Sequence, residues 1–209
     1  MTPIPHFVDL SRADPALIGL TGRAGAGKTA AGDYLHASYG FECIAFADAI
    51  KDQLAQLLAD RGVDHAHLHE PYLKERPIPE FAGLTARQLM QTLGDWGRAQ
   101  SPGFWVLQLM HRAGLQRGGT PVHDRIVITD VRYPNEAAWL RLHGGVLLRL
   151  QRDGCSLAAE QAAHSSEAHV HSLDAHVDLL NNGPTLYGLH ALLDGAMADL
   201  HLERRPRDV

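Results

Sequence analysis

An eight-residue segment near the start of the chain has the residue types needed to bind nucleotide phosphates. Residues 22–29 read Gly-Arg-Ala-Gly-Ala-Gly-Lys-Thr and match the pattern G-x-x-x-x-G-K-[ST] at every fixed position. Glycines let backbone N–H groups turn inward around phosphate oxygens, and the N-terminus of a following helix adds positive potential there. In this pattern Lys28 contacts the β- and γ-phosphates and Thr29 binds Mg²⁺. The predicted nucleotide-binding residues are Gly22, Gly25, Ala26, Gly27, Lys28, Thr29 and Ala30.

A second candidate residue follows the short β-branched run Ile126–Thr129. Asp130 comes directly after this run, at the carboxyl end of an expected buried strand, where open α/β sheets bind their ligands. An aspartate at this place works with the hydroxyl of the phosphate-binding loop in holding Mg²⁺, so Asp130 and Thr29 are the candidate metal ligands. The alternative is structural, with Asp130 capping the helix that begins near Pro134.

Residues 87–98 carry side chains that could bind an acceptor molecule. Arg87, Gln91 and Arg98 are spaced to lie on related faces of a helix and its exit. Arginine forks match phosphate oxygens and amides match base edges, so this segment could hold a planar base and an anionic phosphate. The alternative is a surface helix with solvated arginines and a buried Trp96.

Two further arginines, Arg149 and Arg152, end an expected strand and precede a polar segment over about residues 152–172. Arginines at this place could fold over the γ-phosphate as a lid and stabilise charge on the transferred phosphoryl group. The alternative for either arginine is a solvated surface charge.

Short apolar runs alternate with helix-like segments along the chain, which is typical of a parallel α/β sheet. We expect a three-layer α/β fold with a mainly parallel five-stranded sheet, in one domain over residues 1–209. Strands are expected at residues 17–21, 41–46, 126–129, 146–150 and 177–180. Helices are expected at residues 28–38, 48–58, 87–94, 104–115, 134–142 and 186–202, with Thr85 capping the third. Residues 61–79, rich in His, Pro and charge, indicate a loop or a mobile excursion.

The composition favours a protein of the reducing cell interior. The chain has 209 residues, 45% of them hydrophobic, and its formal net charge of −5 gives no overall attraction for nucleic-acid phosphates. Its two cysteines, Cys43 and Cys155, form neither a CxxC pair nor a disulfide framework. The first residues lack the pattern of a signal peptide, and no apolar stretch approaches the roughly 20 residues that span a bilayer. We therefore expect a cytoplasmic protein that binds neither nucleic acid nor membrane.

Three alternating histidines, His65, His67 and His69, raise the alternative of a zinc site. They lack a second group of ligands with a recognisable spacing, which zinc sites normally have. We expect a solvated loop at these residues.

Together these segments resemble the deoxynucleoside monophosphate kinase family found in bacteriophages. The likeness runs in the family's order from Leu17 to about Leu193, and its most particular parts are Leu-Gly-x-x-Trp-Gly-Arg and Asp-Val-Arg-x-x-Asn-Glu. The segments that carry it are Gly19–Thr29, Phe46-Ala47-Asp48 with Lys51, Leu89–Gly94 with Trp96-Gly97-Arg98, Thr129–Glu136, and His164 with Ser166 and Glu167. Residues 61–79 match no motif of the family.

The resemblance implies a P-loop nucleoside-kinase-like fold with an acceptor-binding excursion over about residues 48–105 and the lid. It also implies ATP, Mg²⁺ and a deoxynucleoside monophosphate as partners. If a phage encodes the protein, the expected location is the host cytoplasm. Whether the chain forms a homodimer is left open. The implied catalytic residues are Lys28, Arg132 and Arg149. The implied acceptor-side residues are Asp48, Lys51, Arg87, Gln91, Trp96, Arg98, Asp130, Arg132 and Glu167.

The expected chemistry is direct in-line transfer from ATP to an acceptor phosphate. Such an acceptor is already anionic at neutral pH, so positioning and charge stabilisation suffice for catalysis. A hydroxyl acceptor would instead need a general base, for which Asp48 is the candidate. Two alternatives stay open: a P-loop kinase for dephospho-coenzyme A or phosphomevalonate, and a nucleotide-gated binding protein without catalysis.

Overall fold

The chain forms two compact units, which we describe separately. The computed structural model describes residues 16–115, 120–154, 169–170 and 172–205. The sheet unit comprises Met1–Ile44 and Ala113–Val209, and the helical unit is Ala45–Arg112. The expected acceptor excursion, about residues 48–105, falls within the helical unit.

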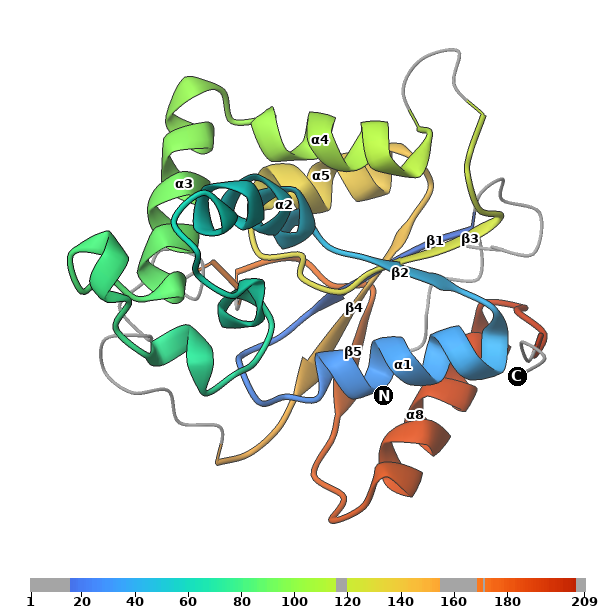
Figure 1. Cartoon of the computed structure of the whole chain (residues 1–209). Helices are drawn as coiled ribbons and strands as arrows, with labels where there is room; N and C mark the ends of the chain where they lie inside the picture. Colours follow the sequence, from blue (N-terminus) through green and yellow to red (C-terminus); the bar gives the residue numbers. More distant parts are fainter. Residues whose placement is uncertain (1–15, 116–119, 155–168, 171, 206–209) are drawn as a thin grey trace. The chain divides into compact units, whose positions relative to one another are not determined.

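A five-stranded sheet forms the centre of the sheet unit (Figure 1). All neighbouring strands are parallel, in the order β2-β3-β1-β4-β5, which confirms the predicted five-stranded α/β sheet. β1 and β3 are buried along their whole length, as expected for central strands of a parallel sheet. The strands are β1 (Ala16–Thr21), β2 (Glu42–Ile44), β3 (Arg125–Ile128), β4 (Val146–Gln151) and β5 (Val177–Leu180).

β2 is shorter than predicted, because Phe46 begins a helix instead of ending the strand. The backbone N–H of Ala45 donates to the Asp48 carboxylate at 2.8 Å, so Asp48 caps the helix that begins at Phe46. The apolar run over residues 41–46 resembles a strand along its whole length, but this cap ends the strand two residues earlier.

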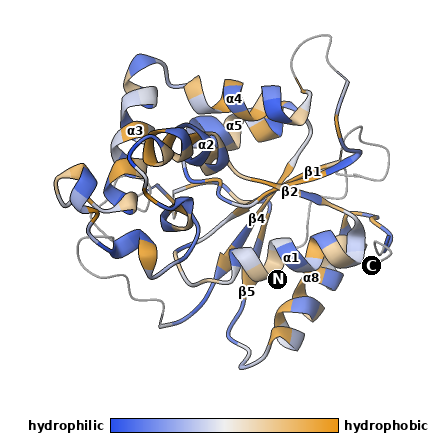
Figure 2. Cartoon of the chain, viewed as in Figure 1, coloured by the Kyte–Doolittle hydropathy of each residue, from blue (hydrophilic) through white to orange (hydrophobic). Residues whose placement is uncertain are grey.

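Within the described part of the sheet unit, the sheet is covered by α1 (Lys28–Tyr39), α5 (Pro134–Leu142) and α8 (Leu186–Asp199). α1 and α8 pack on one face, where the buried cluster includes Ile18 and Leu20. On the other face, a Cβ at Gly19 would lie 2.5 Å from the Leu140 side chain of α5. The helices on both faces and the sheet between them make three layers. Figure 2 shows that hydrophobic and hydrophilic residues alternate along α1.

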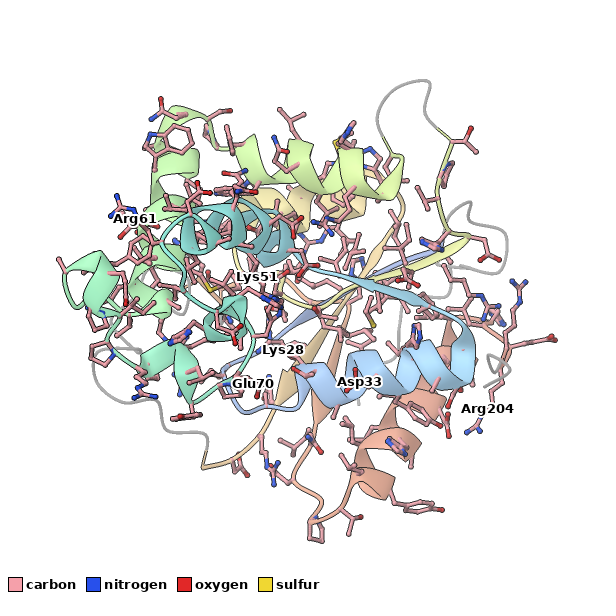
Figure 3. The ribbon with its side chains drawn as sticks, viewed as in Figure 1. Lys28, Asp33, Lys51, Arg61, Glu70 and Arg204 are labelled. Carbon is pink, nitrogen blue, oxygen red and sulfur yellow. The ribbon has the colours of Figure 1, made fainter. Side chains whose placement is uncertain are left out.

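A carboxylate on α8 links α1 to the chain that follows α8. The Tyr34 and Tyr39 hydroxyls each donate to Asp194 at 2.7 Å, and the Arg204 guanidinium, labelled in Figure 3, donates to it at 2.7 Å. Partial burial disfavours the charge on Asp194, but the hydrogen bonds from Tyr39, Tyr34 and Arg204 outweigh it and lower the pKa of Asp194. Burial and the bond to Asp194 raise the pKa of Tyr39 to about 12, so this tyrosine stays a donor.

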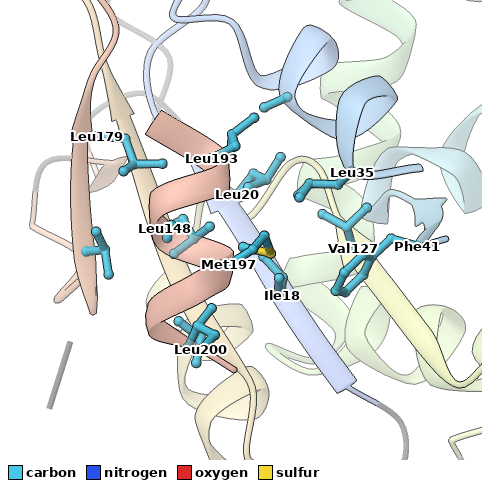
Figure 4. Close-up of a cluster of buried hydrophobic side chains, with 14 of the residues drawn as sticks. Ile18, Leu20, Leu35, Phe41, Val127, Leu148, Leu179, Leu193, Met197 and Leu200 are labelled. Atoms are coloured by element: carbon cyan, nitrogen blue, oxygen red, sulfur yellow. The ribbon is translucent and has the colours of Figure 1, made fainter. Parts of the chain in front are cut away.

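The core beneath α1 and α8 is continuous and apolar (Figure 4). Ile18, Leu148 and Leu193 are each 0% exposed, and Met197 fills the space between the helices and the strands. Burying each such side chain contributes roughly 1.5–3 kcal/mol. This core fixes β1 and the start of α1, and therefore the loop that connects them.

The helical unit contains three α-helices and three short 3₁₀ helices. Its elements are α2 (Phe46–Ala59), η2 (His65–Leu68), η3 (Leu73–Glu75), η4 (Pro79–Phe81), α3 (Ala86–Gln100) and α4 (Phe104–Ala113). The residues predicted as a loop, 61–79, therefore contain 3₁₀ turns. Thr85 caps α3 as predicted, because its hydroxyl accepts from the Gln88 N–H while its own N–H donates to the Gln88 side chain.

α3 extends six residues beyond its predicted end at Gly94, and the reason is its packing against α4. The Trp105 indole donates to the Gly94 carbonyl at 2.9 Å, and a Cβ at Gly97 would lie 2.7 Å from the same ring. Gly97 makes room for Trp105 and the Gly94 carbonyl accepts its hydrogen bond, so neither glycine ends the helix. Trp105 is 2% exposed whereas Trp96 is 50% exposed, so the expectation of a buried Trp96, which is one part of the structural alternative for this helix, is wrong.

Among the described residues, no helix is both long and apolar enough to cross a membrane.

Candidate active site

The loop of residues 22–29, here called the phosphate loop, connects β1 to α1 in the predicted strand–loop–helix order. Gly22 has φ +145°, and a Cβ there would lie 2.3 Å from the Leu150 carbonyl oxygen. Gly27 has φ +101° at the N-cap of α1, and a Cβ there would lie 2.7 Å from the Asn181 amide nitrogen. Both positions therefore require glycine for conformation and for space.

Lys28, the first residue of α1, folds its side chain back onto the phosphate loop (Figure 3). Its ammonium donates to the carbonyl oxygens of Gly22 at 2.6 Å and Arg23 at 2.9 Å. The carbonyl and N–H groups of one trans peptide point in opposite directions, so these bonds also orient the N–H groups that follow in the loop. The Lys28 ammonium lies within reach of a group bound by the loop.

The N-terminus of α1 is suited to an anion. Gly27 provides no side-chain cap, and the first turn of the helix contains no acidic residue. The first N–H groups of a helix lack partners inside the helix and carry part of its positive dipole. Backbone groups of this kind bind phosphate oxygens at helix N-termini.

Asp130 lies just past the end of β3, where two backbone bonds hold the chain. The Thr129 N–H donates to Ile44 at 3.0 Å, and the Val131 N–H donates to Leu20 at 3.1 Å. A Cβ at Gly32 on α1 would lie 2.9 Å from the Thr129 methyl group, so the chain beside Asp130 packs against α1. Gly32 is one turn beyond Thr29, which brings the start of α1 and the end of β3 to the same edge of the sheet.

The predicted metal ligands, Thr29 and Asp130, have side-chain oxygen atoms, which are the ligand type that Mg²⁺ prefers. Mg²⁺ in kinases uses one or two protein ligands together with substrate phosphates and water, so this pair fits the ion. Over the described stretches of the chain, no group of three or more His, Cys, Asp or Glu side chains could hold a metal ion. The alternating histidines over residues 65–69 therefore form no such group.

The turn that carries Arg132 is held by a buried carboxylate. Glu136 is 4% exposed and accepts from the backbone N–H groups of Arg132 at 2.8 Å and Tyr133 at 3.1 Å. The position of Arg132 after β3 is thus fixed through its backbone, and the residue is half-buried.

A pocket of about 190 Å³ adjoins the phosphate loop. It is lined by Gly22, Arg23, Ala26, Val170 and the residues from Arg149 to Asp153 at the end of β4. Within it, Arg149 already has structural partners, since it lies 3.3 Å from the Asp178 carboxylate and donates to the Leu173 carbonyl. Its predicted catalytic role stays a prediction, and Arg152 is more exposed than Arg149.

The predicted acceptor cations of the helical unit are each paired with a carboxylate of that unit. Lys51 lies 3.2 Å from Asp48, Arg98 lies 2.8 Å from Asp95, and Arg87 bonds to Glu75 of η3. Because Asp48 also caps α2, its carboxylate has a structural task. An anionic ligand that bound these cations would have to compete with their carboxylate partners.

α3 brings three predicted acceptor residues onto one face. Arg87, Gln91 and Arg98 lie within about 40° of one another around the helix at ~100° per residue, and Arg98 belongs to the helix itself. Trp96, half-exposed, packs edge-on against Phe104 with ring centroids 5.6 Å apart. Glu167, with His164 and Ser166, lies outside the described residues, as does most of the predicted lid.

Sequence reasoning missed two residues of interest. Lys74 is half-buried on η3, and burial together with the charges of Lys51 and Arg87 lowers its pKa. Asn181 follows β5 and donates to the phosphate loop. Lys74 had no sequence signal because residues 61–79 match no motif. Asn181 had none because an asparagine at the end of a strand is typical of a turn.

The sequence is 31% identical over 180 residues to the Acanthamoeba polyphaga mimivirus protein named "Putative deoxynucleotide monophosphate kinase", covering 81% of this chain and 90% of that protein. The chain belongs to the deoxynucleoside monophosphate kinase family. It is therefore a P-loop kinase, and a phosphotransferase by class.

A second relative of this kinase is the uncharacterized protein ORF76 of Ictalurid herpesvirus 1 (strain Auburn), 30% identical over 178 residues, or 79% of this chain and 70% of that protein. Among solved structures, the TT1252 protein of Thermus thermophilus matches with a TM-score of 0.49 at 19% identity, over 89% of this chain and 98% of that one. No model of a protein family matches the sequence.

Proposed function

We propose that this kinase transfers the γ-phosphate of ATP to the phosphate of a deoxynucleoside 5′-monophosphate, giving ADP and the deoxynucleoside diphosphate. The observation that carries the proposal is the complete phosphate loop, with the Lys28 ammonium on its carbonyls, in a chain that resembles a protein named for this activity over most of its length. P-loop kinases bind the phosphates of the donor nucleotide through such a loop.

In the proposed reaction, an oxygen of the acceptor phosphate forms a bond to the γ-phosphorus while the bond to the β,γ-bridging oxygen breaks. The backbone N–H groups of the phosphate loop and the N-terminus of α1 would bind the donor phosphates. Lys28 would stabilise the charge on the transferred phosphoryl group and the leaving oxygen. Thr29 and Asp130 would hold Mg²⁺, which would neutralise part of the charge on the donor phosphates.

The acceptor phosphate is already anionic, so the protein needs no strong general base for this step. Lys51, Arg98 and Arg132 are the proposed contacts of that phosphate, and Gln91 is the proposed contact of the base edge. Trp96 offers an exposed aromatic face on which a base can stack. The other proposed acceptor residues are Asp48, Arg87, Asp130 and Glu167.

The direct test is an acceptor panel with ATP and Mg²⁺, in which product is separated and identified. The panel holds dAMP, dCMP, dGMP, dTMP, their ribonucleotide counterparts, dephospho-coenzyme A and phosphomevalonate, and Lys28→Ala is the control for contaminating kinases. We expect a diphosphate product from at least one deoxynucleotide. Transfer only to one of the last two acceptors would overturn the proposed substrate, and ATP binding with no transfer at all would overturn the proposed reaction.

A further inference from the structure

One buried side chain from the far end of the sheet contacts the phosphate loop. Asn181 comes directly after β5 and is 5% exposed. Its side-chain amide donates to the carbonyl oxygen of Ala26 at 3.0 Å. Its backbone N–H donates to Gln151 at 2.7 Å, so the end of β4 fixes where the asparagine stands.

The bond from Asn181 determines the direction of a whole peptide group. Ala26 is 1% exposed, so water has little access to replace the amide as a donor. The Ala26 carbonyl and the Gly27 N–H belong to the same trans peptide and point in opposite directions. Holding the carbonyl against Asn181 therefore turns the Gly27 N–H away from the asparagine.

The fit between Asn181 and the loop leaves no room for a side chain at Gly27. A Cβ at that position would lie 2.7 Å from the Asn181 amide nitrogen, closer than such atoms approach. The glycine of the loop and the asparagine after β5 are thus complementary in shape as well as in hydrogen bonding.

We propose that Asn181 is a positioning residue of the phosphate loop, whose amide fixes the direction of the Gly27 N–H and thereby sets the affinity of the loop for the phosphates of ATP. The inference rests on the donor half of the proposed function, in which the loop binds ATP, and is independent of which acceptor is used. Asn181 acts through the loop backbone and needs no contact with the nucleotide.

The test replaces the amide by a carboxyl of nearly the same shape. In Asn181→Asp, the ionised side chain cannot donate to the Ala26 carbonyl and repels it, whereas the protonated side chain can donate through its O–H. A carboxyl buried beside a carbonyl oxygen has a pKa above its usual value of about 4. The ratio of the variant's dissociation constant for ATP with Mg²⁺ to that of the wild type should therefore depend on pH.

Calorimetric titrations without acceptor at several pH values between 5 and 8 give this ratio. We expect binding by Asn181→Asp to be about tenfold weaker or more at pH 8, and the ratio to fall toward unity as the pH is lowered. Asn181→Ala removes the donor without adding a charge, so its weaker binding should show the same ratio at every pH. This second variant keeps the test valid if Asn181→Asp does not fold, and circular dichroism establishes the fold of each variant.

The matched control is Asn182→Asp, the same substitution one residue later, at an exposed side chain that bonds to Asp153 instead of the loop. It should stay within about twofold of the wild type. Three outcomes would each overturn the inference. The first is an equal loss of ATP affinity in the control and in Asn181→Asp, and the second is a ratio for Asn181→Asp that does not change with pH. The third is unchanged ATP affinity in a folded Asn181→Ala. If the wild type itself does not bind ATP, the proposed function fails instead.

Discussion

The two units of this kinase offer different kinds of binding group to a charged ligand. In the sheet unit, the phosphate loop is defined by backbone: Gly22 and Gly27 have positive φ, the Ala26 carbonyl is bonded to a buried amide, and Lys28 lies on the loop's own carbonyls. In the helical unit, the candidate acceptor groups are side chains on helices, and each cation has a carboxylate neighbour.

The difference shows how each part can discriminate between ligands. A loop whose N–H groups are fixed before binding loses little entropy on binding and is complementary to any triphosphate of the right shape. Side-chain pairs must exchange partners when an anion arrives, and partly exposed pairs of this kind are worth only about 0–1 kcal/mol each. In the proposed function, acceptor selectivity would therefore depend on several weak exchanges of ion-pair partners, whereas donor binding would depend on one rigid loop.

The largest effect is expected for Lys28→Ala. Removing the ammonium should lower kcat by about 100-fold or more, as loss of one preorganised charge-stabilising donor does in other enzymes. The sheet unit should remain folded, because the Lys28 ammonium donates to carbonyls of its own loop, at Gly22 and Arg23, whereas the core is formed by apolar side chains. Turnover at saturating substrates and the thermal unfolding midpoint test this, and near-normal turnover would contradict the assignment of the phosphate loop.

The next effect concerns the acceptor arginines. Arg98→Ala and Arg132→Ala should each lower kcat/KM for the acceptor by roughly 10- to 150-fold, since a charged hydrogen bond to phosphate contributes about 1.5–3 kcal/mol. Affinity for ATP should stay close to that of the wild type. Lysine in place of either arginine should restore little, because a point charge does not replace the planar fork.

Arg112→Ala is the matched control for these arginines. Arg112 also pairs with a carboxylate of the helical unit, Asp52, but it is not among the proposed acceptor residues. It should retain acceptor kinetics near the wild type. Loss of ATP affinity in Arg98→Ala or Arg132→Ala would move that arginine to the donor side.

A smaller effect would show directly that the ion pairs compete with the acceptor. Asp95→Asn removes the charge of the Arg98 partner and should lower the acceptor KM by up to about fivefold, in line with the strength of an exposed pair. The measurement is the acceptor KM at several salt concentrations, because screening should reduce the difference between variant and wild type. A higher KM would mean that Asp95 orients Arg98 for binding and does not compete.

The smallest effect is on stability and comes from a histidine of the sheet unit. Burial, followed by the charge of Arg141, lowers the pKa of His176 below its ordinary value of 6.5, and its Nδ1 accepts from the Leu147 N–H at 2.9 Å. A histidine with a lowered folded-state pKa contributes stability above pH 6.5 and loses it as the pH falls through the lowered pKa.

Urea unfolding between pH 7.5 and 5 should therefore show a falling free energy of unfolding, with the lost bond worth about 1 kcal/mol. His176→Gln should make this decline shallower, whereas His111→Gln, at an exposed position of α4, should leave it unchanged. An equal slope in the wild type and His176→Gln would contradict the prediction.

Local sequence was sufficient to predict the sheet and the loop, because their signals are short-range. The β-branched run before Asp130 gave β3, Pro134 gave the start of α5, and the phosphate-binding pattern gave the start of α1. The predictions that were wrong depended on contacts with distant parts of the chain or on side-chain hydrogen bonds. Gly94 looked like the end of a helix, but its carbonyl accepts a hydrogen bond from Trp105 on the next helix, and the helix continues to Gln100.

In the candidate site, too, residues with a local sequence signal could be predicted and residues with distant partners could not. Residues in motifs, such as Lys28 and Asp130, could be named from their spacing alone. Asn181 could not, because its bond reaches Ala26, which is 155 residues away in sequence. Nor could the carboxylate partner of Arg87, since Glu75 belongs to a segment that matches no motif.

The helical unit is one uninterrupted piece of chain, Ala45–Arg112, joined to the rest at only two peptide bonds. In the proposed function this piece carries most of the acceptor contacts, and the glycines, lysine and asparagine of the donor site all lie outside it. A gene for such a protein can acquire a new acceptor preference by recombination at two crossover points while the ATP site is inherited intact. In the proposed function, exchanging this piece of chain would change the acceptor contacts while the donor site is kept.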